Sequence, residues 1–297
     1  MNAENTWQIY ATGDHYHDVV DTPADLKALT QATTGKSFRR IGRFIQLALI
    51  GASRCAGQTT LPANTGVYMA SGRGDLELTL DIMTQLFRDA QAPKPLSFVN
   101  TVSNAACFYL AQHLGLQSRS NFVCNRYSAF ESVLQLAVQD LSLGIVSSAL
   151  VGSVDIATSP LHEHRLRSKL APETALGEGS HWLWLGPVDQ QRPRVGELLA
   201  VAHCSDREAL LSWINQQNAV DKRCHLAAGQ FIPADEFANI QSACSLNVLT
   251  DAAPRGYYDS HSGGTLNTFL SSATLGDALL HINSDGAQRY SAMLIRR

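Results

Sequence analysis

Short apolar strands alternate with amphipathic helices along most of this chain, and this alternation limits the fold to the α/β class. A helix is expected at residues 37–52, followed by a buried strand at 65–71 and an amphipathic helix at 75–90. A further helix at 102–114 leads to a strand at 120–125, which ends at an abrupt turn. We therefore predict a sheet with helices packed on it.

The segment after this turn carries the clearest signals in the sequence. Ser128 and Glu131 have the S-x-x-E spacing of a capping box, which predicts a sharply defined helix start, and Gly144 ends the apolar helix. A small-residue strand is expected at 148–154, typical of the centre of a sheet that is covered on both faces. Residues 155–176 show weak periodicity and predict a long surface connection.

The alternation resumes after residue 178 and predicts a second α/β half. Strands are expected at 181–185, 196–203, 224–228, 246–249, 279–283 and 290–295, and helices at 206–215 and 234–244. Gly263 and Gly264 predict a turn before a last helix, which runs to about residue 275. A chain of 297 residues can hold one large or two modest domains.

Composition and charge exclude several classes of protein. A net charge of −3 without a basic block argues against nucleic-acid binding. The six cysteines include no C-x-x-C pair, so neither a zinc ribbon nor a disulfide framework is indicated. The apolar run at residues 44–52 is too short to span a bilayer, and the polar first residues lack a signal-peptide core. We expect a cytoplasmic protein without a membrane span.

The turn between the strand at 120–125 and the following helix is where a nucleophile could lie, because a helix N-terminus offers unpaired N–H groups. Tyr127 is a poor nucleophile because a phenol is hardly ionised at neutral pH, and Ser128 is expected to be the helix cap. Cys124 is the nearest thiol, but on a strand we expect it to point into the core.

The histidines allow both structural and chemical roles. Residues 14–18 and 162–164 combine imidazoles with carboxylates that could bind zinc, although a solvated loop is the favoured interpretation of each. His261 lies where a glycine-rich loop enters a helix and is the best single candidate for acid/base or oxyanion work. Gly72 and Gly74 are too closely spaced for a phosphate loop and predict a turn.

Four stretches, residues 114–128, 134–144, 149–155 and 178–179, resemble the β-ketoacyl synthase family of condensing enzymes. The resemblance implies the thiolase-like fold, with two related βα halves whose sheets are sandwiched between helix layers. Residues 1–176 would form the N-terminal half, and residues 177–297 a shortened C-terminal half of one integrated fold.

The same resemblance implies that the catalytic set is incomplete. The family's nucleophilic cysteine falls on Tyr127 and its first active-site histidine on Ala228, whereas the second histidine is retained as His261. The lysine expected five residues earlier falls on Gly256. Condensation needs a thiolate and two imidazoles, so no independent catalysis is expected.

Residues 37–43, 67–75 and 98–106 are similar to chain-length factors of bacterial aryl-polyene clusters, which are short ketosynthase-like proteins. This implies a heterodimer with an active ketosynthase in polyene or fatty-acid-like chain elongation, and a homodimer when the chain is alone. Cys124, Tyr127, Ser128 and Phe130 would line the tunnel or the partner interface. The substrate would arrive on the phosphopantetheine of an acyl carrier protein, with no metal or other cofactor.

Two other functions remain open at this point. The chain could be an independent thiolase-fold acyltransferase or hydrolase, using Cys124 or Ser128 with His261, if these groups lie within about 3.5 Å of each other. It could also be a structural module that docks a carrier protein, using Arg39, Arg40 and Arg43 to contact acidic residues.

Overall fold

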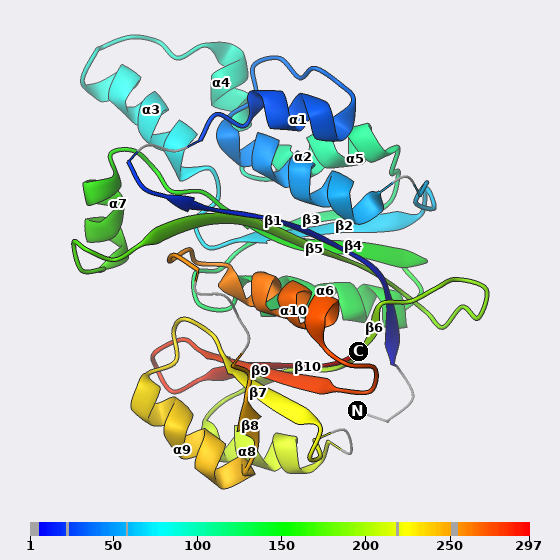
Figure 1. Ribbon diagram of the computed structural model, residues 1–297. Coiled ribbons are helices and arrows are strands. Elements are labelled where there is room, and N and C mark those ends of the chain that lie inside the picture. Colours follow the sequence, from blue (N-terminus) through cyan, green and yellow to red (C-terminus); the bar gives the residue numbers. More distant parts are fainter. Residues whose placement is uncertain (1–5, 22–23, 58, 218–219, 251–254) are drawn as a thin grey trace.

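A computed structural model describes residues 6–21, 24–57, 59–217, 220–250 and 255–297 as a layered α/β protein (Figure 1). The strands are β1 (Trp7–Val19), β2 (Thr65–Ser71), β3 (Ser120–Cys124), β4 (Ser148–Asp155), β5 (Leu176–Gly186), β6 (Gly196–Cys204), β7 (Cys224–Ala228), β8 (Asn247–Val248), β9 (Ala278–Ser284) and β10 (Tyr290–Arg296). The helices are α1 (Lys27–Thr34), α2 (Arg43–Ala56), α3 (Leu76–Phe87), α4 (Pro95–Asn100), α5 (Ala105–Leu114), α6 (Ala129–Ser142), α7 (Leu161–Ser168), α8 (Arg207–Asn215), α9 (Ala234–Cys244) and α10 (His261–Ser272). No helix in these ranges is long and apolar enough to cross a membrane.

The strands fall into two sets with the same internal order. The first set runs β3-β2-β4-β5-β1, and the second, read from its far edge, runs β8-β7-β9-β10-β6. Each strand of the first set thus has a counterpart in the second, and α6 and α10 occupy equivalent connections. This topology confirms the expected thiolase-like fold of two related halves.

A single strand joins the two sets. Trp7, Gln8 and Ile9 at the start of β1 pair with β6, while most of β1 pairs with β5. The result is one continuous ten-stranded sheet that folds around α6 and α10, which lie between its two parts (Figure 1). Helices α1, α2 and α5 cover the outer face of the first part, and α8 and α9 cover that of the second.

Several expected elements are confirmed at the residue level. The strands at 65–71 and 224–228 and the helix at 234–244 have the predicted bounds. The helix expected from residue 37 begins only at Arg43, after a left-handed residue at Arg40 and an extended Gly42. Helices α1 and α4 are short and were not predicted.

The prediction of a solvated loop at residues 14–18 is wrong, because this stretch belongs to β1. Two of its polar side chains have partners on the neighbouring strand β5. His17 pairs with the buried carboxylate of Glu178 at 2.9 Å, and Asp14 bonds to His181 on the neighbouring strand β5. Such partners are distant in sequence, so local polarity indicated the wrong environment.

Two further predictions are corrected. Residues 155–176 contain the helix α7 instead of a purely irregular connection, so His162 and His164 are helical. Gly263 and Gly264 lie buried in the first turn of α10 rather than in a turn before it. A Cβ on Gly264 would lie 2.4 Å from the Arg255 guanidinium and 2.8 Å from the Tyr258 hydroxyl, so the glycines permit close packing.

The division between the halves follows from the strand pairing. Strand β5 pairs with β1 and β4 along its length, so the first sheet extends to Gly186. We therefore propose that the halves meet in residues 187–195, between β5 and β6, rather than between residues 176 and 177.

Candidate functional site

The two central helices bring the candidate residues of both halves to one region. Tyr127 lies in the turn between β3 and α6, and His261 is the first residue of α10. Ala228 ends β7 and pairs with Ile282 on β9, beside Asn283. The Asn283 side-chain amide donates to the Tyr127 carbonyl at 2.9 Å, so the segments holding Tyr127, Ala228 and Asn283 adjoin one another.

A buried clamp behind Tyr127 connects α6, α10 and β9. The Asn283 amide also lies 3.3 Å from Glu131 Oε1, which accepts a hydrogen bond from Ser262 Oγ at 2.8 Å. Burial raises the pKa of Glu131, which is 1% exposed. Burial lowers the pKa of the adjacent His281 to about 4, so its imidazole is neutral at pH 7. Burial therefore disfavours the charged forms of both side chains.

The predicted capping box between Ser128 and Glu131 does not form. Ser128 is the N-cap of α6, as expected, but its side chain makes no capping hydrogen bond. Ser128 Oγ instead accepts from the Asn125 amide at 2.9 Å, and Glu131 turns into the core toward α10. The Glu131 carboxyl group, which the sequence pattern assigned to the helix cap, thus bonds to the second half of the molecule instead.

The Tyr127 ring lies in an aromatic cluster at the surface. It packs edge-on against Phe231 with ring centroids 5.1 Å apart, and Phe231 packs edge-on against Tyr257 at 6.2 Å. The Arg126 guanidinium lies 5.6 Å from the Tyr127 centroid and 5.8 Å from that of Phe231. Tyr127 remains 38% exposed, so one side of the ring faces open space.

A cavity of about 510 Å³ opens next to Tyr127. It lies between the start of α6, the end of β6 and the β9–β10 hairpin, and most of its lining residues have polar side chains. The lining residues are Asn125, Tyr127, Ser128, Ser132, His203, Cys204, Ser205, Asp285, Ala287, Arg289, Tyr290 and Ser291. Tyr127 therefore forms one wall of a space large enough for a small molecule or part of a chain.

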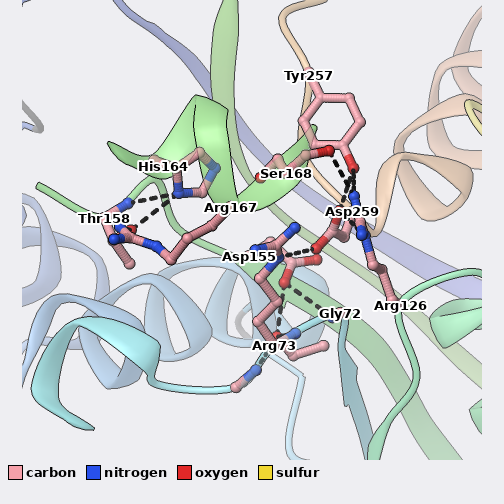
Figure 2. A network of polar contacts seen from close by, with 12 residues as sticks. Gly72, Arg73, Arg126, Asp155, Thr158, His164, Arg167, Ser168, Tyr257 and Asp259 are labelled. Atoms are coloured by element: carbon pink, nitrogen blue, oxygen red, sulfur yellow. Dashed lines mark hydrogen bonds and ion pairs between the residues drawn. The ribbon is translucent and has the colours of Figure 1, made fainter. Parts of the chain in front are cut away.

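A polar network includes Arg126, which lies in the turn between β3 and α6 (Figure 2). Asp259 accepts from Arg73 Nε at 2.7 Å and from the Tyr257 hydroxyl, while Arg126 donates to the Ser168 carbonyl at 2.8 Å. Asp155 Oδ1 accepts from Ser71 Oγ at 2.7 Å and from the Gly72 amide at 2.9 Å. The network fixes the ends of β2 and β4 to the loop before α10.

Asp155 is the most perturbed acid of this network. Burial, and then the negative charge of Asp259, raise the pKa of Asp155 to about 7. Both carboxylates lie close to Cys124, and after burial they also raise the pKa of its thiol. Cys124 is therefore a protonated thiol at neutral pH rather than an activated nucleophile.

Cys124 and Phe130 occupy environments other than those expected. Cys124 was expected to face the core, but it is exposed at the end of β3, with Sγ 3.6 Å from the Gly72 carbonyl. The strand is the outermost of its sheet, which explains the exposure. Phe130 is 1% exposed and packs in the core between the halves, so we leave it out of the surface proposed below.

His261 makes no hydrogen bond to Cys124 or Ser128, the two candidate nucleophiles. Its Nδ1 lies 3.2 Å from Thr265 Oγ1, and its ring lies 5.5 Å from that of Tyr258. Burial, with the nearby His181, His281 and Arg255, lowers the pKa of His261 to about 3. Since Cys124 and Ser128 bond elsewhere, neither forms a nucleophile–base pair with His261.

A chain of polar residues beneath His261 was missed from the sequence. His181 Nδ1 bonds to the Asp14 carboxylate, and His181 Nε2 lies 2.8 Å from the Tyr258 hydroxyl. Arg255 donates to the same hydroxyl at 3.3 Å. No local pattern links positions 14, 181 and 258, so only the strand pairing of β1 with β5 reveals this arrangement.

Histidines in the other two clusters form hydrogen bonds with neighbouring residues. His15 Nδ1 lies 3.0 Å from an Arg54 nitrogen, and His164 Nδ1 lies 3.1 Å from the Thr158 amide. Within the described ranges, no group of three or more histidine, cysteine or acidic residues is arranged to hold a metal ion.

Comparison with known structures shows the same fold over nearly the whole chain. The ishigamide ketosynthase/chain length factor is 17% identical, with a TM-score of 0.76 over 98% of this chain and 99% of that one. AntDE:AntF, a type II PKS acyl-carrier protein in complex with its ketosynthase bound to the hexaketide, is 12% identical, with a TM-score of 0.71 and the same coverages. The PfaC keto synthase-chain length factor is 13% identical with a TM-score of 0.71, over 98% of this chain but 42% of that one.

Sequence comparison identifies the family. No curated protein matches the chain. The profile of the beta-ketoacyl synthase N-terminal domain matches residues 5–171, which is more than half of the sequence. Together with the fold, this match shows that the chain belongs to the beta-ketoacyl synthase family.

Proposed function

We propose that this chain is a catalytically inactive ketosynthase-like subunit, a chain-length factor, that pairs with an active β-ketoacyl-ACP synthase. The proposal rests on Tyr127, which the sequence resemblance assigns to the position of the family's nucleophile and which is held by Asn283 and packed against Phe231. The names of the ishigamide and PfaC proteins, which share the fold, support a role of this kind.

The residues available cannot perform the condensation. A phenol at position 127 cannot replace a thiolate as the acyl carrier, and Ala228 has no imidazole to stabilise an enolate. His261 is retained, but it is neutral and bonds to Thr265 of its own helix. The independent acyltransferase or hydrolase is disfavoured because Cys124 and Ser128 have other hydrogen-bond partners.

Tyr127 is suited to act as a wall that limits a growing chain. Its backbone carbonyl is fixed by Asn283, and its ring is held between Phe231 and the Arg126 guanidinium. An aromatic ring held in this way presents a rigid apolar face. We infer that Tyr127 and Ser128, which line the cavity of about 510 Å³, set the space available near the partner's tunnel.

An exposed surface beside Tyr127 supports pairing with a second subunit. Strand β3 is the edge of the sheet, and α5, which contacts it, connects through α4 to α3. Large apolar side chains are exposed along α3, α4, α5 and the connection between α4 and α5, namely Met83, Leu86, Phe87, Leu96, Phe98, Val99, Val102 and Phe108. Such an edge and patch are typical of an interface, and an obligate one would bury more than about 2,000 Å².

The finer parts of the proposal concern the pathway. We propose that the complex acts in the cytoplasm on aryl-polyene or fatty-acid-like chains carried by the phosphopantetheine of an acyl carrier protein. The partner would be an active ketosynthase, and a homodimer would form when the chain is alone. The similarity of residues 98–106 to aryl-polyene chain-length factors motivates this choice of chain.

Reconstitution tests the proposal. The chain would be expressed alone and together with the ketosynthase encoded beside it, and each preparation assayed for condensation of malonyl-carrier protein. We expect the chain alone to be inert, the pair to be active, and His261→Ala to leave the activity of the pair unchanged. Turnover of an acyl substrate by the chain alone, abolished by His261→Ala, would instead establish an independent enzyme.

A further inference from the structure

A second cavity lies at the opposite end of the first sheet from Tyr127. Its volume is about 440 Å³, within the usual range of small-molecule sites. Tyr10 on β1 and Trp184 on β5 form its floor, and the loop between β5 and β6 forms one side. Trp184 pairs with Leu150 near the start of β4, whereas Tyr127 lies beyond the opposite ends of these parallel strands.

Arg192 in this loop is held by aromatic stacking. Its guanidinium carbon lies 4.5 Å from the Trp184 ring centroid and 5.0 Å from that of Tyr10, and the two rings are 5.2 Å apart. Stacking on two rings orients a guanidinium without using its N–H donors. Arg192 is thereby preorganised for an acceptor.

The outer end of this guanidinium lacks an acceptor among the described residues. Asp189 is the nearest carboxylate, and its Oδ2 lies 4.0 Å from Nε, the inner nitrogen of Arg192. The other carboxylate oxygen of Asp189 accepts a hydrogen bond from the backbone N–H of Gln191, which stabilises the loop. The two terminal nitrogens, which form the fork that binds carboxylates, make no hydrogen bond within the described ranges.

A second donor, on a residue that lines this cavity, also lacks a partner among the described residues. The Trp184 indole N–H is buried without a hydrogen bond in the described structure, and the Trp184 side chain is 3% exposed. Buried donors are nearly always paired, so an unpaired indole N–H is an unusual feature of the wall of this cavity. Ala11, Ala56 and Pro193 contribute apolar surface to the same cavity.

We propose that this cavity is a binding site for a small organic carboxylate, which the terminal nitrogens of Arg192 hold while its apolar body lies against Tyr10 and Trp184. The site is separate from the Tyr127 region and does not depend on the function proposed for it. A carboxylate fits because the guanidinium fork matches its planar geometry and an apolar wall adjoins the fork.

Tryptophan indole signals provide a direct test. The chain has four tryptophans, so protein labelled with 15N-tryptophan gives few indole N–H resonances, and Trp184→Phe identifies the one of interest. Sodium benzoate and inorganic phosphate would be titrated separately into the full-length chain. Variants would be Arg192→Gln, Arg192→Lys and the matched control Arg194→Gln, whose side chain is exposed and pairs with Glu197.

We expect benzoate to shift the Trp184 signal saturably in the natural protein and in Arg194→Gln. Removal of the fork in Arg192→Gln or Arg192→Lys should raise Kd by about tenfold or more, the effect of losing a charge-assisted hydrogen bond. No saturable shift in the natural protein, or an unchanged Kd in the Arg192 variants, would overturn the proposal. Phosphate binding as tight as benzoate binding would contradict the role assigned to the apolar wall.

Discussion

Asn283 connects Tyr127 to the centre of the molecule through hydrogen bonds to groups on two elements. Its amide donates to the Tyr127 carbonyl and to Glu131, and it is 2% exposed. A Cβ on Gly229 would lie 2.3 Å from the Asn283 side chain, so the residue beside Ala228 leaves space for this clamp. The position of the Tyr127 ring thus depends on side chains from both halves.

Removing the clamp should therefore cost stability. Asn283→Ala removes the side-chain donor to the Tyr127 carbonyl and one of the two side-chain donors to Glu131, and we expect the free energy of unfolding to fall by about 1–3 kcal/mol. Urea denaturation followed by circular dichroism measures the change. Asn247→Ala, at an exposed edge position, is the matched control and should change it by less than about 0.5 kcal/mol. Equal effects of both variants would contradict the clamp.

Buried histidines should make stability depend on pH. His281 is fully buried, and its pKa falls from 6.5 to about 4 on folding. The unfolded chain therefore binds the proton first, so stability is lost as the pH falls from about 6.5 to 4, at about 1.4 kcal/mol per pH unit for one proton. His281→Leu should reduce this slope in urea titrations between pH 7 and 4.5. An unchanged slope would show that His281 does not contribute.

At the scale of elements, the sequence correctly predicts the helices and strands whose signals are local. The strand at 65–71 and the helix at 234–244 have strong periodicity and were predicted with their exact limits. Strand β1 was missed because its polar residues Asp14 and His17 find partners on β5, more than a hundred residues away. The turn at Tyr127 was predicted, but the Asn283 clamp depends on packing between the halves and has no local signal.

The exposed apolar surface of α3, α4 and α5, next to the edge strand β3, should determine whether the chain pairs with a second subunit. Phe98 is 58% exposed in this apolar surface, and Phe98→Asp places a charge where desolvation would be costly. We expect this variant to lose self-association and pairing with the ketosynthase, as measured by size-exclusion chromatography with light scattering. Leu275→Asp, 80% exposed beyond the end of α10, is the control and should assemble normally. Normal assembly of Phe98→Asp would place the interface elsewhere.

At the scale of the whole molecule, the repeated topology brings the starts of α6 and α10 together. These two helices occupy equivalent connections, and they carry Tyr127 and His261 at or just before their first turns (Figure 1). The fold of a condensing enzyme is thus present, and we propose that the groups that would carry the reaction are replaced at two of three positions.

The length of the product made by the reconstituted pair tests this account most directly. Product length would be measured by mass spectrometry for pairs that contain the natural chain, Tyr127→Ala or Tyr127→Phe. We predict longer products with Tyr127→Ala, because removing the ring enlarges the space, and unchanged products with Tyr127→Phe, which retains the ring. Active pairs that make products of the same length with all three chains would contradict the role of Tyr127 as the limiting wall.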